Sequence, residues 1–217
     1  MQALTLSQIE RLGERLRKGV TPEDLALLRT LRESYRPVLD VVVAEVRGVA
    51  EALGVEAALA TRPAKTTRSI IAKLQRERTN LARMQDIAGC RIVVPDRAQQ
   101  NAIVEELQRR QPLWKTDDLR DRPHHGYRAV HLVTPRPLPV EVQVRTLLEQ
   151  VWASLSEALD RRSEGVKYGR GPQLVLDYLA RGSERLAAWD AAGGPDAALL
   201  RDKEALVTRL TAILTEP

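Results

Sequence analysis

Aromatic residues are scarce in this sequence: phenylalanine is absent from its 217 residues, and all aromatics together make up 3%. A hydrophobic core must therefore be built from Leu, Ile, Val and Ala. Cys90 is the single cysteine, which excludes an internal disulfide framework. The N-terminus has no basic segment followed by an apolar one, and the most apolar early run, residues 38–44, is interrupted by Asp40 and far too short to span a bilayer. We therefore expect a soluble, cytoplasmic protein with no membrane partner.

Histidine is also scarce, with three residues and none before His124. No cysteine or further histidine lies near these three at ligand spacing, so a zinc-type site is not expected. Charged residues, in contrast, make up 29% of the chain and leave a net charge of +5. This surplus favours an anionic partner such as a nucleotide, a nucleic acid or an anionic surface. Surplus arginine that only solvates the surface is the alternative.

The length of 217 residues suits one sizeable domain or two small ones. Because no repeat or interdomain linker is evident and helix and strand patterns both occur, we expect a single α+β domain over residues 1–217, with N-terminal helices in 1–60, a catalytic core in 61–168 and C-terminal helices in 172–217. Helices are expected at 7–18, 21–53, 65–76, 79–85, 96–110, 146–160, 173–192 and 196–215. Strands are expected at 89–95, 112–118, 127–133 and 140–146. Ser7 is the expected cap of the first helix, and Pro37 is expected to split or kink the second.

Residues 140–146 alternate valine with polar residues, which is the period of a strand with one buried face. Glu141, Gln143 and Arg145 then emerge together on the other face. A carboxylate, an amide and a guanidinium fixed on a strand can hold a metal ion, a ribose and a phosphate. A solvated outer face is the alternative, and most alternating strands have one.

The segment 65–76 carries a basic stripe at helical spacing. Its members, separated by four, four and three positions, are Lys65, Ser69, Lys73 and Arg76. Apolar residues occupy the opposite side of the helix. Such a stripe can grip a polyphosphate, because guanidinium and ammonium groups bind phosphate oxygens. An amphipathic helix with a solvated outer face is the alternative.

Two further stretches carry polar residues at positions typical of sites. Asp86 stands between the expected helix 79–85 and the strand opened by Gly89, where a carboxylate can be a metal ligand or only a cap. Gly126 is expected to form a turn into the next strand, with Tyr127 and His131 on one face. The tyrosine can stack on a base and the histidine can contact phosphate or ribose. A half-buried pair at a sheet edge is the alternative.

Taken together, these stretches resemble a known family. The sequence Asp-Ile-Ala-Gly-Cys-Arg at 86–91 follows the basic helix, Gly-Tyr-Arg-Ala-Val-His follows at 126–131, and Glu-Val-Gln-Val-Arg-Thr at 141–146 precedes Trp152. In this order and spacing they resemble the synthetase domain of the RelA/SpoT family, the alarmone synthetases, over about residues 65–167.

The resemblance implies a mixed β-sheet flanked by α-helices, distantly like nucleotidyltransferases. It implies Mg²⁺-dependent transfer of the β,γ-pyrophosphate of ATP to the 3′-hydroxyl of GDP or GTP. Asp86 and Glu141 then correspond to the metal-binding and catalytic acids, and Tyr127 to the residue that stacks on the acceptor guanine. The remaining implied nucleotide contacts are His131, Gln143 and Arg145 on the acceptor or phosphate side, and Lys65, Ser69, Lys73 and Arg91 on the ATP side.

The sequence departs from the family pattern at several points. Pro123, His124 and His125 replace the basic residue and asparagine common before the Gly-Tyr pair, and the histidine common after Trp152 is missing. No histidine precedes His124, so the hydrolase of long family members is not expected. The resemblance is therefore to stand-alone small synthetases, several of which form homotetramers. Two alternatives stay open: a toxic relative that modifies tRNA 3′ ends or adenosine nucleotides, and a non-catalytic nucleotide- or RNA-binding module.

Overall fold

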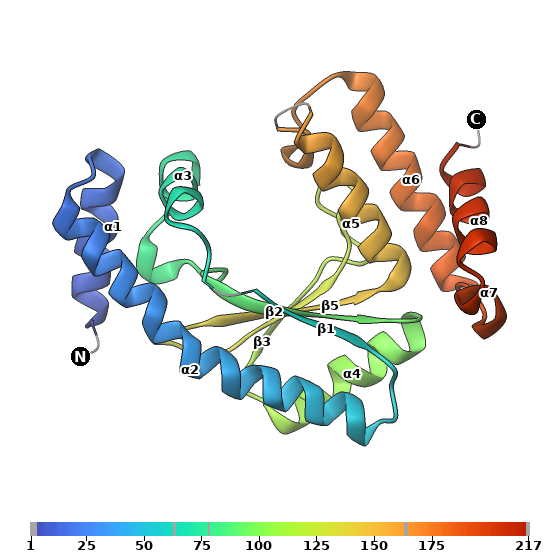
Figure 1. The fold of residues 1–217 in the computed structure, drawn as a ribbon, viewed down its shortest axis with the longest axis horizontal. Helices are drawn as coiled ribbons and strands as arrows, with labels where there is room; N and C mark the ends of the chain where they lie inside the picture. Colours follow the sequence, from blue (N-terminus) through green and yellow to red (C-terminus); the bar gives the residue numbers. More distant parts are fainter. Residues whose placement is uncertain (1–3, 63, 78, 163–164, 216–217) are drawn as a thin grey trace.

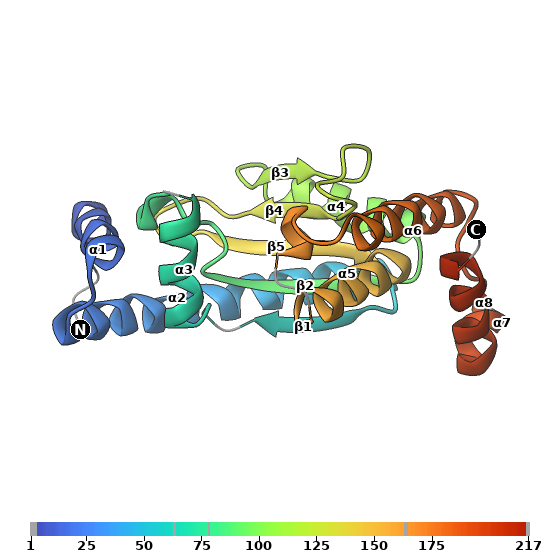
Figure 2. The same ribbon diagram turned by 90° about the horizontal axis from the view of Figure 1, so that it is seen from above.

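The computed structural model describes residues 4–62, 64–77, 79–162 and 165–215. Its centre is a five-stranded sheet in the order β1-β2-β5-β4-β3 (Figures 1 and 2). The strands are β1 (Ala58–Arg62), β2 (Ala88–Val94), β3 (Lys115–Asp118), β4 (Val130–Val133) and β5 (Val140–Thr146). β2 and β5 run parallel, while the other pairs are antiparallel. The mixed sheet with its flanking helices confirms the predicted α+β class.

The alternating pattern of β5 has the predicted consequence. Its three valines are fully buried, whereas Glu141 and Gln143 are partly exposed on the opposite face. Gly89 of β2 is the register partner of Glu141. A β-carbon at position 89 would lie 2.5 Å from the backbone oxygen of Glu141, so only glycine lets β2 and β5 approach this closely. The centre of the sheet therefore fixes the position of Glu141.

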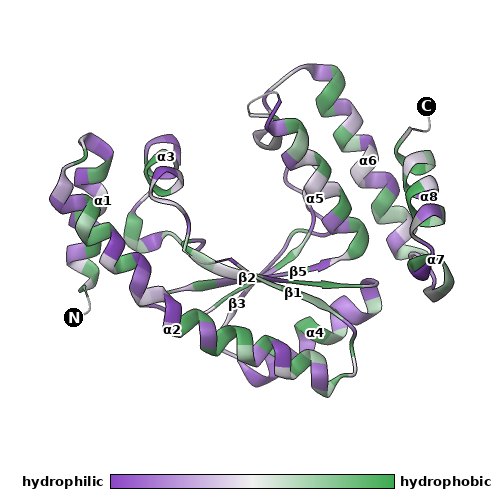
Figure 3. Cartoon of the chain, in the orientation of Figure 1, coloured by the Kyte–Doolittle hydropathy of each residue, from purple (hydrophilic) through white to green (hydrophobic). Residues whose placement is uncertain are grey.

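Helices cover the two faces of the sheet differently. α2 (Pro22–Ala52) and α4 (Arg97–Arg110) lie on one face, where they contact β2 and β5. α3 (Thr67–Glu77) and α5 (Leu147–Asp160) stand on the other face, on opposite sides of its centre (Figure 1). Hydrophobic residues become frequent in the second half of α2, and its buried valines pack against the sheet (Figure 3). The polar side chains of β5 lie on the face of the sheet that carries α5, where they line a pocket together with Glu157 of that helix.

A second hydrophobic cluster joins α5 to the C-terminal helices α6 (Gln173–Ala191) and α8 (Lys203–Thr215). The predicted single helix 196–215 is wrong, because α7 (Ala197–Arg201) ends and α8 restarts after Asp202. Asp202 has extended backbone angles, and its carboxylate accepts a hydrogen bond from the backbone N–H of Ala205 at 3.0 Å. A side chain that caps a new helix thus interrupts an otherwise continuous helical pattern.

Two predictions in the N-terminal helices need correction. α1 (Leu6–Lys18) is capped by Thr5 rather than Ser7, because Thr5 forms a reciprocal capping box with Gln8. α2 continues through Pro37 as one helix of 31 residues, so the expected split does not occur, while the alternative of a kink stays a prediction. Proline removes one helical hydrogen bond, and burial of the apolar face on both sides of Pro37 outweighs that loss. Thr21 and Pro22 begin this helix as their sequence predicts.

The segments around the core strands differ in length from prediction. The basic helix begins at Thr67, so Lys65 precedes it. The helix expected at 79–85 is only a 3₁₀ turn, η1 (Leu81–Arg83), and the strand expected from residue 127 begins at Val130. β1 was not predicted, since most of its residues are exposed and no buried face alternates along it. No helix within the described ranges combines the length and the hydropathy that a bilayer-spanning segment requires.

Candidate active site

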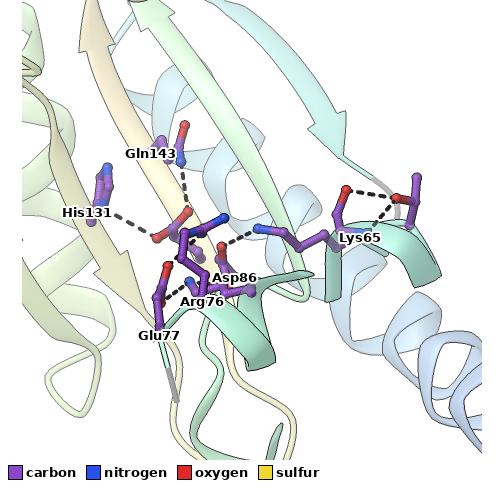
Figure 4. A network of polar contacts seen from close by, with 10 residues as sticks. Lys65, Arg76, Glu77, Asp86, His131 and Gln143 are labelled. Carbon is purple, nitrogen blue, oxygen red and sulfur yellow. Dashed lines mark hydrogen bonds and ion pairs between the residues drawn. The ribbon is translucent and has the colours of Figure 1, made fainter. Parts of the chain in front are cut away.

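Asp86 lies between η1 and β2, and two lysines form ion pairs with its carboxylate. Lys65 Nζ is 2.7 Å from Oδ2, and Lys73 Nζ of α3 is 2.9 Å from Oδ1 (Figure 4). The backbone N–H of Lys65 donates to the carbonyl of Ile87, which ties this segment to β2. Burial alone would raise the pKa of Asp86, but the two ammonium groups outweigh burial and lower it. Asp86 is therefore ionised at neutral pH.

Glu141 emerges from β5 with both carboxylate oxygens held by neighbours. Gln143 Nε2 donates to Oε2 at 2.7 Å, and His131 Nδ1 lies 3.3 Å from Oε1 (Figure 4). The β4–β5 register pairs His131 with Gln143, so the three side chains share one face. Burial would raise the pKa of Glu141, but the hydrogen bonds from His131 and Gln143 outweigh burial and lower the pKa overall. Glu141 is an oriented, charged carboxylate.

The contacts of Glu141 close into a ring of hydrogen bonds. Arg145 Nη2 donates to Gln143 Oε1 at 3.0 Å and to the Tyr127 hydroxyl at 2.7 Å. The hydroxyl is 2.8 Å from His131 Nε2. Because arginine only donates, the hydroxyl accepts from Arg145 and can donate to Nε2, which leaves the Nδ1 hydrogen for Glu141. Burial raises the pKa of Tyr127, so its hydroxyl keeps this proton.

A tight turn places Tyr127 in this ring. Gly126 has φ of +86°, and a β-carbon there would lie 2.7 Å from the Trp152 ring of α5. Its carbonyl accepts a hydrogen bond from Ser183 of α6 at 2.6 Å. The predicted turn residue thus joins the sheet to the C-terminal helices. The Arg145 guanidinium lies 4.9 Å from the Tyr127 ring centroid, so the ring also packs against a cation.

Asp86 and Glu141 line the same pocket, as the sequence predicts. Arg91, Gln143 and Arg145 also line it. The negative charge of Asp86 acts to raise the pKa of Glu141, because the two carboxylates repel each other. An acid from the segment before β2 and an acid from β5 therefore converge beside a group of guanidinium side chains.

The two carboxylates of this pocket suit a divalent cation that also binds substrate phosphates. The described residues contain no group of three or more His, Cys, Asp or Glu side chains placed to hold a metal ion. Magnesium, however, is commonly bound through one or two carboxylates together with substrate phosphates and water. Asp86 and Glu141 fit that pattern, and a cation would relieve their mutual repulsion. Since Lys65 and Lys73 contact both oxygens of Asp86, a cation would share the carboxylate with these lysines or displace one of them.

A second pocket adjoins the first, and Arg62 lines both of them. It is lined by Lys65 and Ser69, together with Arg76 of α3 and Tyr168, which belongs to the 3₁₀ turn η2 (Val166–Tyr168). The Arg76 guanidinium lies 4.3 Å from the centroid of the Tyr168 ring, so this contact joins α3 to the loop after α5. The predicted basic stripe therefore does not act as one surface: Lys73 points to Asp86, while Ser69 and Arg76 face the second pocket.

The structure brings together most of the predicted site residues, and it adds one. Gln150 of α5 accepts hydrogen bonds through Oε1 from Arg91 at 2.7 Å and from Arg145 at 2.9 Å. No periodicity or motif marks a glutamine in the first turns of a helix. Only the contact between β2, β5 and α5 reveals its role.

Comparison with known protein families gives a match to the region found in RelA / SpoT proteins over residues 62–162. Uncharacterised proteins of Mycobacterium tuberculosis and Mycobacterium bovis are 35% identical over 178 residues. The alignment covers 76% of this chain and 62% of those relatives, so the chain spans about three fifths of their length. The GTP pyrophosphokinase YjbM of Bacillus subtilis is 30% identical over 141 residues, which cover 58% of this chain and 65% of YjbM.

Solved structures share the fold. Small alarmone synthetase 1 of Bacillus subtilis, bound to its product pppGpp, matches with a TM-score of 0.62 and 24% identity over 78% of this chain and 93% of that chain. Small alarmone synthetase 2 of the same organism matches with a TM-score of 0.64 and 23% identity over 82% and 98%. At this level of identity the likeness concerns the fold.

Proposed function

We propose that the chain is a member of the RelA/SpoT family, whose characteristic region matches residues 62–162, and that it is a Mg²⁺-dependent pyrophosphokinase that uses ATP to modify the 3′-hydroxyl of GDP or GTP. The observation that carries this proposal is the convergence of Asp86 and Glu141 in one pocket walled by arginines. Pyrophosphoryl transfer depends mainly on positioning and on neutralising phosphate charge. The pocket offers the groups for both tasks.

Glu141 is the proposed proton acceptor. The 3′-oxygen of the acceptor attacks the β-phosphorus of ATP, the bond from that phosphorus to the α,β-bridging oxygen breaks, and AMP leaves with the electron pair. The hydroxyl proton passes to the Glu141 carboxylate. Its lowered pKa keeps Glu141 ionised, and the ring of hydrogen bonds fixes its orientation before substrate arrives.

Asp86 and Glu141 would hold Mg²⁺, which when bound neutralises phosphate charge and orients the pyrophosphoryl group. Lys65 and Lys73 both contact the Asp86 carboxylate. Their ammonium groups are therefore placed to contact the donor phosphates once these enter. Ser69 lines the adjoining pocket, where the stacked Arg76 and Tyr168 side chains offer planar groups against which the adenine of ATP can pack.

Two features bear on the identity of the acceptor. Tyr127 is the proposed stacking partner of guanine, but its hydroxyl is engaged by two neighbours and Arg145 packs on its ring. The His124–His125 turn also departs from the family pattern. These two features keep tRNA 3′ ends and adenosine nucleotides as candidate acceptors. Assembly of a homotetramer remains a prediction.

Product identification tests the proposal. Purified protein is incubated with Mg²⁺ and ATP labelled in the β-phosphate, and with GDP, GTP, ADP, ATP or deacylated tRNA as acceptor. We expect AMP and a guanosine nucleotide carrying the label at its 3′ position. Label transfer only to tRNA or to an adenosine nucleotide would replace the acceptor but keep the chemistry. Absence of AMP and of every labelled product would support a non-catalytic binding module.

A further inference from the structure

The turn that places Tyr127 has a costly backbone conformation. The backbone N–H groups of His124 and Tyr127 each donate to the other residue's carbonyl, at 3.3 and 3.0 Å. Between them, His125 has φ of +53° and Gly126 has φ of +86°. Glycine adopts such angles readily, but a residue with a side chain does so at a cost that its surroundings must offset. Contacts from outside the turn must therefore stabilise its shape.

Three other elements hold this turn in place. Ser183 of α6 donates a hydrogen bond to the Gly126 carbonyl at 2.6 Å. The Trp152 ring of α5 lies against Gly126, so closely that a β-carbon there would be 2.7 Å from the ring. The His125 ring lies against Gly169, which ends η2, and leaves no room for a β-carbon at that position. Of these three contacts, the hydrogen bond from Ser183 acts directly on the backbone of the turn.

Helix α6 fixes two of these three contacts. The carbonyl of Leu179, one helical turn before Ser183, accepts a hydrogen bond from Trp152 Nε1 at 2.8 Å. Both residues of α6 are buried, and the Tyr127 ring packs against the hydrophobic cluster that α6 shares with α5. The Ser183 hydroxyl also accepts a hydrogen bond from Nε of Arg128 at 3.1 Å. This hydroxyl is thus bonded to the residue before Tyr127 and to the residue after it.

We infer that Ser183 is a positioning residue: it fixes the Gly126 turn and thereby the place of the Tyr127 side chain in the site. This inference rests on the proposed function and deepens it, because Tyr127 is the proposed stacking partner of the acceptor base and belongs to the hydrogen-bonded ring around Glu141. A hydroxyl suits the task, since it donates to a carbonyl and accepts from a guanidinium at the same time. Alanine at position 183 would remove both hydrogen bonds.

Hydrogen exchange of the full chain, detected by NMR, tests the inference without requiring turnover. In Ser183→Ala we expect the Tyr127 amide to exchange at least about fivefold faster than in the unmodified protein. The amides of β2 should exchange as before, which excludes a general loss of structure. Ser183→Cys, whose thiol is only a weak donor, should change the exchange in the same direction and serves if the alanine variant misfolds. Ser34→Ala is the matched control, since the Ser34 hydroxyl also donates to a backbone carbonyl, that of Leu31 in its own helix, at 2.7 Å; it should leave all these rates unchanged.

Steady-state transfer then shows whether Ser183 acts through Tyr127. Ser183→Ala should raise the KM for the acceptor by about fivefold or more and lower kcat, while the KM for ATP changes little. In a Tyr127→Ala background, which lacks both the ring and the hydroxyl, Ser183→Ala should cause little further loss. Ser34→Ala should leave all three kinetic parameters unchanged.

The outcomes separate this inference from the proposed function. Unchanged exchange of the Tyr127 amide in both Ser183 variants would overturn the inference, as would a normal acceptor KM and kcat in Ser183→Ala. A kinetic loss that persists in full in the Tyr127→Ala background would overturn it as well. If exchange rises as expected but no acceptor is modified, the proposed function fails, while the role of Ser183 in holding the turn stands.

Discussion

Substitution of Tyr127 by phenylalanine separates two roles that the site allows for this residue. The ring remains available to stack on a base, and only the hydroxyl is lost. That hydroxyl accepts from Arg145 at 2.7 Å and lies 2.8 Å from His131 Nε2. Its removal opens the ring of hydrogen bonds on the side that reaches Glu141 Oε1, whereas the bond from Gln143 to Oε2 remains.

The structure sets the expected magnitude. A hydrogen bond to a charged group contributes about 1.5–3 kcal/mol, and a neutral one about 1 kcal/mol. The hydroxyl makes one contact of each kind, and its loss also frees the His131 ring that orients Glu141. If the lost hydrogen bonds raise the free energy of the transition state by about 2 kcal/mol, kcat falls on the order of 30-fold. The KM for the acceptor should change little, since the stacking surface is kept.

Steady-state pyrophosphate transfer with both substrates varied provides the assay. Tyr178→Phe is a suitable control, because within the described chain the Tyr178 hydroxyl makes no hydrogen bond. It should behave as the unmodified protein. A Tyr127→Phe variant with normal kcat would refute the reasoning, since the hydroxyl would then contribute nothing to the orientation of Glu141. A rise in KM with unchanged kcat would refute it equally.

Three further predictions concern charge and packing. Asp86→Asn should abolish turnover and remove part of the acid sensitivity of the fold. Because the folded pKa of Asp86 is lowered, its ionised form adds to the free energy of unfolding; this contribution is full above the unfolded pKa of about 4 and is lost as pH falls through the folded pKa. Urea unfolding at several pH values measures it. Asp190→Asn should raise the melting temperature at neutral pH by about 2–4 °C, because burial raises the pKa of Asp190 and disfavours its charged form in the fold. This rise should shrink as pH falls, and a rise that is the same at every pH would contradict burial of the charge as its cause. Gly89→Ala should destabilise by about 1–3 kcal/mol through the clash with the Glu141 backbone, whereas the helical control Gly48→Ala, which meets no atom within 4 Å, should be neutral or stabilising in the same denaturant titration.

The period-2 pattern of the sequence predicted the part of the site that lies on strand β5. Three valines on one face of β5 place Glu141, Gln143 and Arg145 on the other without any tertiary information. The parallel pairing of β2 with β5 then brings Asp86 and Arg91 beside them. The sequence implied this convergence only through motif order, because pairing between distant strands leaves no local signal.

Contacts that depend on tertiary packing were not predicted. Gln150 lies in a helix whose bounds were predicted to within one residue, yet its link to two arginines depends on where α5 meets the sheet. Tyr127 was expected to offer its ring, and the structure shows that its hydroxyl is equally engaged. β1 was missed because an exposed edge strand needs no apolar alternation. The break at Asp202 was missed because a polar cap inside a helical pattern resembles an ordinary exposed residue.

The most direct test of the account is the rate of AMP formation by Glu141→Gln with saturating ATP, acceptor and Mg²⁺. Glutamine preserves the size of the side chain but removes the negative charge and the ability to take a proton. The account predicts a loss on the order of 10²–10⁴-fold relative to the unmodified protein, in a variant that remains folded at the assay temperature. A Glu141→Gln variant that forms AMP and labelled product at the normal rate would contradict it.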